Sequence, residues 1–132
     1  KSAAYVDDFI DHVMETHGVS ADKVALVGFS QGTMMSLQTA PRRDNEIAGV
    51  VGFSGALLGE QTFGAEIKSR PPMVLVHGTA DPVVPIEASR LAKDTLAANG
   101  IEVSLHERPG LQHGIDEEGL RIAAGFLTKV LA

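Results

Sequence analysis

A serine flanked by two glycines gives the clearest chemical signal in the chain. The segment Gly28-Phe29-Ser30-Gln31-Gly32 follows a short apolar run and precedes residues with helical spacing. A serine at such a strand-to-helix turn has its hydroxyl lifted clear of the sheet, and we expect side chains at positions 28 and 32 to collide with neighbouring chain. The amide of Gln31, at the start of the helix, can donate to a developing negative charge. The pattern therefore predicts Ser30 as a nucleophile.

A second segment of the same kind provides an internal comparison. Gly52-Phe53-Ser54-Gly55-Ala56 resembles the first segment, but alanine occupies the position of its second glycine. We therefore interpret Ser54 as a residue at the end of a strand, without a direct role. The segment around Ser30 could also be no more than a glycine-lined turn, so its assignment depends on partners elsewhere in the chain.

A serine hydroxyl needs a base to take its proton, and that base needs a carboxylate to orient it. After a nucleophile at a strand-to-helix turn, these partners follow in the order aspartate and then histidine. Asp81 comes soon after the apolar run 73–76, and His113 comes soon after the run 103–106. The carboxyl ends of parallel strands share one edge of a sheet, where such residues can meet. We predict Ser30, Asp81 and His113 as a catalytic triad, called the predicted triad below.

Both partners of the serine have competitors. Asp81 precedes Pro82 and could belong only to a turn, and Asp116 is an alternative orienting carboxylate near the start of the last helix. At His77 we expect a structural hydrogen bond rather than base catalysis. The remaining histidines are interpreted as solvated or as part of a strand: His12, His17 and His106.

Strand and helix patterns alternate along the chain, and these elements must position the predicted triad. Short runs rich in apolar residues predict strands at 24–27, 48–53, 73–76 and 103–106. Apolar residues at three- and four-residue steps predict helices at 2–17, 33–40, 85–98 and 115–131. This alternation indicates a single α/β domain over residues 1–132, with about four parallel strands flanked by helices. We expect strand 24–27 to be buried on both faces.

The composition excludes several classes of function. The chain has 132 residues, a formal net charge of -6 and no cysteine. It therefore has no disulfide, no thiol nucleophile and no cysteine-containing zinc site, and its scattered basic residues argue against nucleic acid as a partner. No apolar run approaches the roughly 20 residues that a membrane-spanning helix needs. We expect a cytoplasmic protein.

Three motifs together resemble the bacterial phospholipase/carboxylesterase family, which includes the acyl-protein thioesterases. They are the segment from Gly28 to Gly32, the segment from His77 to Pro85, and His113-Gly114-Ile115, and the resemblance covers essentially the whole chain. It implies an α/β-hydrolase fold and a small-molecule ester or thioester substrate. No metal and no organic cofactor is implied.

The resemblance also implies roles for individual residues. Ser30 would be acylated, His113 would act as base and then as acid, and Asp81 would orient His113. The amide of Gln31 would donate to the oxyanion. Residues that flank the catalytic loops are candidates for contact with a small or medium acyl group, although each could equally belong to the core: Met34, Leu57, Leu58, Val83 and Leu111.

Members of this family usually have a longer N-terminal part, which holds several more strands and a loop with the second oxyanion amide. This chain starts at Lys1, just before the predicted nucleophile strand, so we expect the Val24–Val27 strand to have a bare edge that can pair with another chain. The chain could be completed by a separate polypeptide, could form a homodimer across this edge, or could be incomplete. Pairing with another chain is favoured. Without a second oxyanion donor from such a neighbour, the catalytic rate of an isolated chain would fall by about 10²–10³.

Two other functions stay open. The chain could be a non-catalytic half-domain that assembles through its sheet edge, or it could be a peptidase or dienelactone-type hydrolase on the same fold. The glutamine at position 31 and the His113-Gly114-Ile115 sequence favour the esterase branch.

Overall fold

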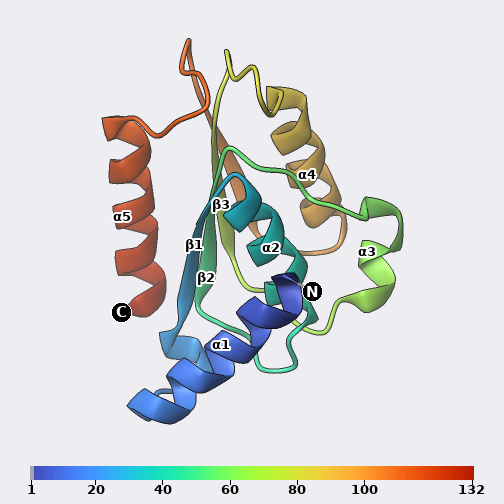
Figure 1. Cartoon of the computed structure of the whole chain (residues 1–132), viewed down its shortest axis with the longest axis vertical. Coiled ribbons are helices and arrows are strands. Elements are labelled where there is room, and N and C mark those ends of the chain that lie inside the picture. Colours follow the sequence, from blue (N-terminus) through green and yellow to red (C-terminus); the bar gives the residue numbers. More distant parts are fainter. Residues whose placement is uncertain (1) are drawn as a thin grey trace.

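A parallel sheet of four strands forms the centre of the molecule (Figure 1). The computed structural model describes residues 2–132, with side chains from residue 4 onward. The strands are β1 (Ala25–Phe29), β2 (Gly49–Phe53), β3 (Met73–Gly78) and β4 (Val103–Arg108), and they lie in the order β1-β2-β3-β4 with every pair parallel. The predicted arrangement of four parallel strands flanked by helices is confirmed.

Helices cover both faces of this sheet. The helices are α1 (Ser2–His17), α2 (Gln31–Thr39), α3 (Glu60–Glu66), α4 (Ile86–Ala98) and α5 (Glu117–Leu131), with short 3₁₀ turns at Ala21–Lys23 and Ala40–Arg42. Figure 1 shows α2 and α4 on one side of the sheet and α5 on the other. Helix α1 packs against α2 and forms an outer layer.

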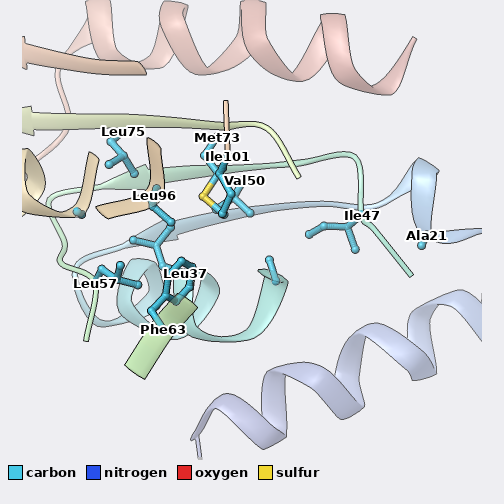
Figure 2. Packing of buried hydrophobic residues seen from close by; sticks show 12 residues of the cluster. Ala21, Leu37, Ile47, Val50, Leu57, Phe63, Met73, Leu75, Leu96 and Ile101 are labelled. Carbon is cyan, nitrogen blue, oxygen red and sulfur yellow. The ribbon is translucent and has the colours of Figure 1, made fainter. Parts of the chain in front are cut away.

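The two faces have separate cores. The larger core lies under α2 and α4, and Figure 2 shows Leu37 and Phe63 near its centre, with Val50 and Leu75 contributed by the sheet. The smaller core lies under α5 and consists of Val51, Phe53, Val74, Val76 and Ala123. Every residue of β2 and β3 is buried. Both strands are buried because helices cover both faces of a central parallel strand, and their continuous apolar runs fit this environment.

Strand β1 differs from the prediction. Val27 is 56% exposed and Phe29 is 41% exposed, so the expectation that this strand is buried on both faces is wrong. These two side chains lie in register with Val51 and Phe53 and therefore point to the α5 side of the sheet. Helix α5 packs over β2 and β3 instead, which leaves that side of β1 open among the described residues.

Several element boundaries also differ from the sequence patterns. The last helix begins at Glu117 rather than at residue 115, because Asp116 accepts a hydrogen bond from the amide of Gly119 at 2.8 Å and caps the helix. The short helix α3 was not predicted. Among the described residues, no helix combines the length and apolar character that crossing a membrane requires.

Candidate active site

The predicted nucleophile occupies a sharp turn between β1 and α2. Ser30 has φ 55° and ψ −112°, a conformation that side chains rarely adopt. A Cβ atom at Gly28 would lie 2.6 Å from backbone atoms of Gly32 and Thr33, so only glycine fits there. A Cβ at Gly32 would meet nothing within 4 Å among the described residues, so the expected collision at position 32 is wrong. The turn requires the first glycine for space but not the second.

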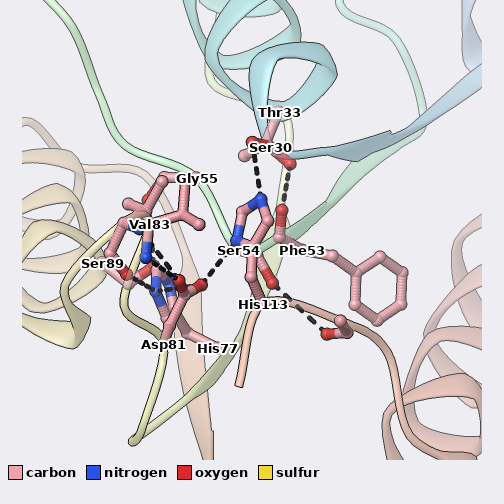
Figure 3. Close-up of polar contacts among 12 residues, drawn as sticks. Ser30, Thr33, Phe53, Ser54, Gly55, His77, Asp81, Val83, Ser89 and His113 are labelled. Atoms are coloured by element: carbon pink, nitrogen blue, oxygen red, sulfur yellow. Dashed lines mark hydrogen bonds and ion pairs between the residues drawn. The ribbon is translucent and has the colours of Figure 1, made fainter. Parts of the chain in front are cut away.

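His113 lies between the other two residues of the predicted triad (Figure 3). Its Nε2 atom lies 3.1 Å from Oγ of Ser30, and its Nδ1 atom lies 2.7 Å from Oδ2 of Asp81. The residues come from three loops at the carboxyl ends of β1, β3 and β4. The structure thus brings together all three residues predicted from the motif order, with Ser30 and Asp81 each within hydrogen-bonding distance of His113.

A glycine at the end of β3 lets the His113 loop approach the sheet. A Cβ atom at Gly78 would lie only 2.1 Å from the carbonyl oxygen of Leu111 and 2.6 Å from that of Gln112. The amide of Ala80 donates to the same Leu111 carbonyl at 3.0 Å. The absence of a side chain at position 78 therefore sets how closely His113 can approach Asp81.

The carboxylate of Asp81 is completely buried and fully hydrogen-bonded. Its Oδ1 atom accepts from the amides of Val83 at 2.8 Å and Val84 at 2.9 Å, and its Oδ2 atom faces His113. Burial alone would raise the pKa of Asp81, but the hydrogen bonds from His113, Val84 and Val83 outweigh it and leave the pKa below its ordinary value. Asp81 is therefore ionised at neutral pH and can hold the imidazole in one orientation.

The competing histidine and carboxylate have other partners. His77 is fully buried, with Nδ1 2.6 Å from the hydroxyl of Ser89 and Nε2 2.7 Å from the carbonyl oxygen of Val84, so the expected structural hydrogen bonding is confirmed. Asp116 accepts from Arg108 at 2.9 Å as well as capping α5, and the Arg108 hydrogen bond lowers its pKa. It is Asp81 that lies against His113.

The start of α2 supplies free amide donors next to Ser30. Gln31 is the first residue of this helix, and no side chain among the described residues caps its N-terminus. The first amides of a helix lack intrahelical partners and carry a partial positive charge. Gln31 directly follows Ser30 in the chain, and its amide can donate a hydrogen bond to an anion that forms at the Ser30 hydroxyl.

The candidate substrate contacts occupy several environments. Leu57 lies in the larger core, where it is 6% exposed, so it has little surface to offer a ligand. Met34 and Leu111 are half-buried, whereas Leu58 and Val83 are exposed. The centre of the Phe29 ring lies 4.9 Å from that of the His113 ring, a contact that the sequence analysis did not predict.

One group of acidic residues is spaced closely enough to share a cation. Within residues 2–132, the carboxylates of Asp7, Asp8 and Asp11 form the only such group. Arg43 already binds Asp7 at 2.7 Å and Asp11 at 2.8 Å. Its guanidinium group offsets the negative charge that a metal ion would need.

Comparisons with known proteins agree with this fold. Residues 1–131 match the model of a family described as Phospholipase/Carboxylesterase. The chain belongs to that family. Within it, the chain is 31% identical to acyl-protein thioesterase 1 of Gibberella zeae and 33% identical to acyl-protein thioesterase 1 of Neurospora crassa.

The chain matches only part of these phospholipase/carboxylesterase relatives. The two alignments cover 98% of the chain in each case, but only 57% and 55% of the relatives. The crystal structure of esterase PE8 has a TM-score of 0.93 and 37% identity, covering 96% of this chain and 59% of that one. For Zea mays acyl-protein thioesterase 2 the TM-score is 0.83 with 26% identity, covering 99% and 64%. The chain therefore spans little more than half the length of the curated relatives it matches.

Proposed function

We propose that this chain carries the site of a serine hydrolase that cleaves carboxylic esters or thioesters of small to medium acyl groups. The observation that carries the proposal is the continuous hydrogen-bonded series from the Ser30 hydroxyl through His113 to the buried Asp81 carboxylate. Such a series lets a serine lose its proton as it attacks a carbonyl carbon.

The proposed reaction has two steps. The Ser30 oxygen bonds to the carbonyl carbon while His113 accepts the hydroxyl proton, and the bond to the leaving alcohol or thiol breaks as His113 passes that proton to it. Water then attacks the acyl-enzyme, again giving up a proton to His113, and the acid is released with Ser30 restored. Asp81 stays ionised throughout and stabilises the imidazolium.

The developing oxyanion needs donors that are already in place. The amide of Gln31 at the start of α2 is one such donor. One donor of this kind contributes about 10²–10³ in rate. We expect a second donor to come from outside the residues described here, which makes the isolated chain a weak catalyst.

The class of substrate follows from the apolar surroundings and the relatives. Phe29 at the end of β1, and Leu58 and Val83 on loops that follow β2 and β3, are exposed apolar side chains, and they suit an acyl chain better than a charged group. The named relatives are acyl-protein thioesterases and an esterase. Both facts support an acyl ester or thioester as the substrate of this chain.

Ser30→Ala tests the proposal directly. The chain should hydrolyse p-nitrophenyl acetate or butyrate and should react with a fluorophosphonate probe at Ser30, and the variant should do neither. Ser104→Ala, which removes an exposed serine on β4, is the matched control and should retain both activities. Equal turnover by the chain and by Ser30→Ala would exclude Ser30 as the nucleophile.

A second candidate function is assembly without catalysis. The open face and free edge of β1 favour it, because a parallel strand with exposed valine and phenylalanine readily accepts another strand. In that case, a correctly folded chain would associate with a second copy or a separate polypeptide but would not react with the fluorophosphonate. Probe labelling therefore distinguishes the two functions.

A further inference from the structure

Strand β2 ends in the middle of the proposed site but contributes no residue to the predicted triad. Its last residue, Phe53, presents a carbonyl oxygen to the Ser30 turn. The amide of Ser30 donates to this oxygen at 2.8 Å, and so does the hydroxyl of the buried Thr33, also at 2.8 Å (Figure 3). Two hydrogen bonds thus tie the nucleophile turn to one carbonyl group of the neighbouring strand.

The next residue, Ser54, contacts the loop that carries His113. Ser54 is fully buried, and its amide donates to the carbonyl of Val76 at 2.9 Å. Its hydroxyl donates to the carbonyl of Gly114, the neighbour of His113, at 3.4 Å. Ser54 also has φ 53°, a strained conformation that a non-glycine residue keeps only where the surroundings hold it. A serine rather than a glycine at this position supplies the hydroxyl that reaches the His113 loop.

The third residue, Gly55, connects to the loop that carries Asp81 through the buried side chains of Ser89 and His77. Its carbonyl lies 3.4 Å from the hydroxyl of Ser89, which lies 2.6 Å from Nδ1 of His77. Since a carbonyl can only accept, Nε2 of His77 donates to Val84 at 2.7 Å, and the same atom lies 3.4 Å from Oδ2 of Asp81. Ser89 has a single hydroxyl proton, which it shares between Nδ1 of His77 and the Gly55 carbonyl, with the shorter contact to His77. Through this shared proton, the end of β2 is connected to the two sides of the Asp81 loop.

The pair of Ser89 and His77 resembles a second serine–histidine site, but it is closed to substrate. Ser89 is 2% exposed and His77 is 0% exposed. A nucleophile at this depth cannot reach an ester. The pair therefore acts on Asp81 and its loop, not on the acyl group.

We propose that residues 53–55, at the end of β2, position all three loops of the predicted triad. The Phe53 carbonyl holds the Ser30 turn, the Ser54 hydroxyl holds the His113 loop, and the Gly55 carbonyl holds the Asp81 loop through Ser89 and His77. These are positioning residues, because none of them touches the reacting atoms. The proposal rests on the proposed hydrolase function and adds to it the residues that keep its three parts in register.

One substitution removes each of these three connections. Thr33→Val keeps the shape of the side chain but removes a bond to Phe53, Ser54→Ala removes the hydroxyl near Gly114, and Ser89→Ala breaks the link to His77. The matched control is Ser69→Ala, because Ser69 is also buried and donates to the carbonyl of Ala40 at 3.3 Å, with neither residue in contact with the predicted triad. Thr33→Val, Ser54→Ala and Ser69→Ala each remove one side-chain hydrogen bond, and Ser89→Ala removes the contacts of its hydroxyl with His77 and Gly55.

The readouts are fluorophosphonate labelling of Ser30 across a range of pH, and the thermal unfolding midpoint. We expect each of the three variants to label about 3- to 10-fold more slowly than the parent chain, as for loss of one hydrogen bond. Ser89→Ala should also displace the pH at which labelling is half-maximal, because it acts through the orienting carboxylate. Ser69→Ala should lower the unfolding midpoint to a similar degree while labelling at the parent rate. Parent-like labelling by all three variants, or an equal loss in Ser69→Ala, would overturn the proposal.

A second measurement separates this proposal from the proposed function. If the parent chain fails to label at all, the hydrolase function fails, but the geometry can still be followed by proton NMR of the His113 Nδ1 proton that faces Asp81. Ser54→Ala and Ser89→Ala should shift or broaden this resonance, and Ser69→Ala should leave it unchanged. An identical resonance in all of these proteins would contradict the positioning role.

Discussion

Asp81 combines complete burial with a negative charge, which normally oppose each other. Burial raises the pKa of a carboxyl group, yet the hydrogen bonds from His113, Val84 and Val83 bring the pKa of Asp81 below its ordinary value. The ionised form is therefore the one that the folded protein stabilises. Because the unfolded chain offers none of these donors, the charge of Asp81 favours the folded state.

This linkage predicts how Asp81→Asn changes stability with pH. The folded-state pKa is lowered, so the Asp81 contribution should be fully present above the unfolded pKa of about 3.9 and lost as the pH falls through the folded pKa. The parent chain should exceed Asp81→Asn in free energy of unfolding at pH 5, and this difference should shrink toward pH 2.5. Urea unfolding over this range measures the difference. A difference that grows on acidification would contradict the assigned pKa direction. Labelling by the variant should fall on the order of 10⁴-fold.

Ser30, Asp81 and His113 could be predicted because the sequence shows their order along the chain and their positions after predicted strands. Thr33, Gly78 and Ser89 could not, since what distinguishes them is a contact between distant segments. Gly78, for example, matters because the Leu111 carbonyl would lie 2.1 Å from any Cβ there. A sequence pattern identifies chemical groups more readily than the residues that hold them in place.

The two glycines of the turn between β1 and α2 differ in the space available for a side chain. Gly28→Ala would place a methyl group 2.6 Å from backbone atoms of Gly32 and Thr33, which cannot move without distorting α2. We expect it to lower the free energy of unfolding by about 1–3 kcal/mol and to abolish labelling of Ser30. Gly32→Ala meets nothing within 4 Å among the described residues and should change stability by less than about 1 kcal/mol, toward greater stability, because alanine favours the helix.

Urea unfolding and probe labelling of the two glycine variants measure these effects. Gly32→Ala is the matched control for Gly28→Ala, since both add one methyl group to the same turn. Equal losses of stability and labelling in the two variants would show that the turn tolerates a side chain at neither position. The conclusion that only position 28 requires glycine would then be wrong.

At the level of elements, the sequence predicted the strands and four of the five helices, but not the burial of β1. Its apolar residues resemble those of β2, although Val27 is 56% exposed and β2 is buried throughout. Burial depends on whether a helix covers the strand, and α5 packs over β2 and β3. The residues of β1 contain no signal of where α5 will lie. Helix α3 has only seven residues, too few to establish a helical period.

The sheet is asymmetric across the described part of the chain, because there only β1 of the two outer strands presents a broad apolar surface. At β1 the exposed valine and phenylalanine lie beside a strand edge with free backbone groups, whereas outer strand β4 is half-buried along most of its length. Exposed edges of this kind pair readily with other strands. The second candidate function therefore predicts that another chain joins the sheet at β1, and a second copy of this chain is the case that can be tested directly.

Val27→Lys tests this association without touching the predicted triad. A lysine on an edge strand opposes pairing, because two copies that join edge to edge would bring like charges onto neighbouring strands. The parent chain should have the mass of two chains by light scattering, and Val27→Lys should have the mass of one. Leu91→Lys on α4 is the control, since Leu91 is similarly exposed at 51%, and it should remain paired. A parent chain with the mass of one chain would exclude pairing through β1.

Association should also affect catalysis if the second copy supplies a second oxyanion donor. The labelling rate per chain should then rise with protein concentration in the parent chain and in Leu91→Lys, and it should stay low and constant in Val27→Lys. One recovered donor contributes about 10²–10³ in rate, so the rise should be far larger than any effect of charge on the probe. A parent chain that pairs but labels at a constant rate would place the second donor elsewhere, while leaving the assembly surface intact.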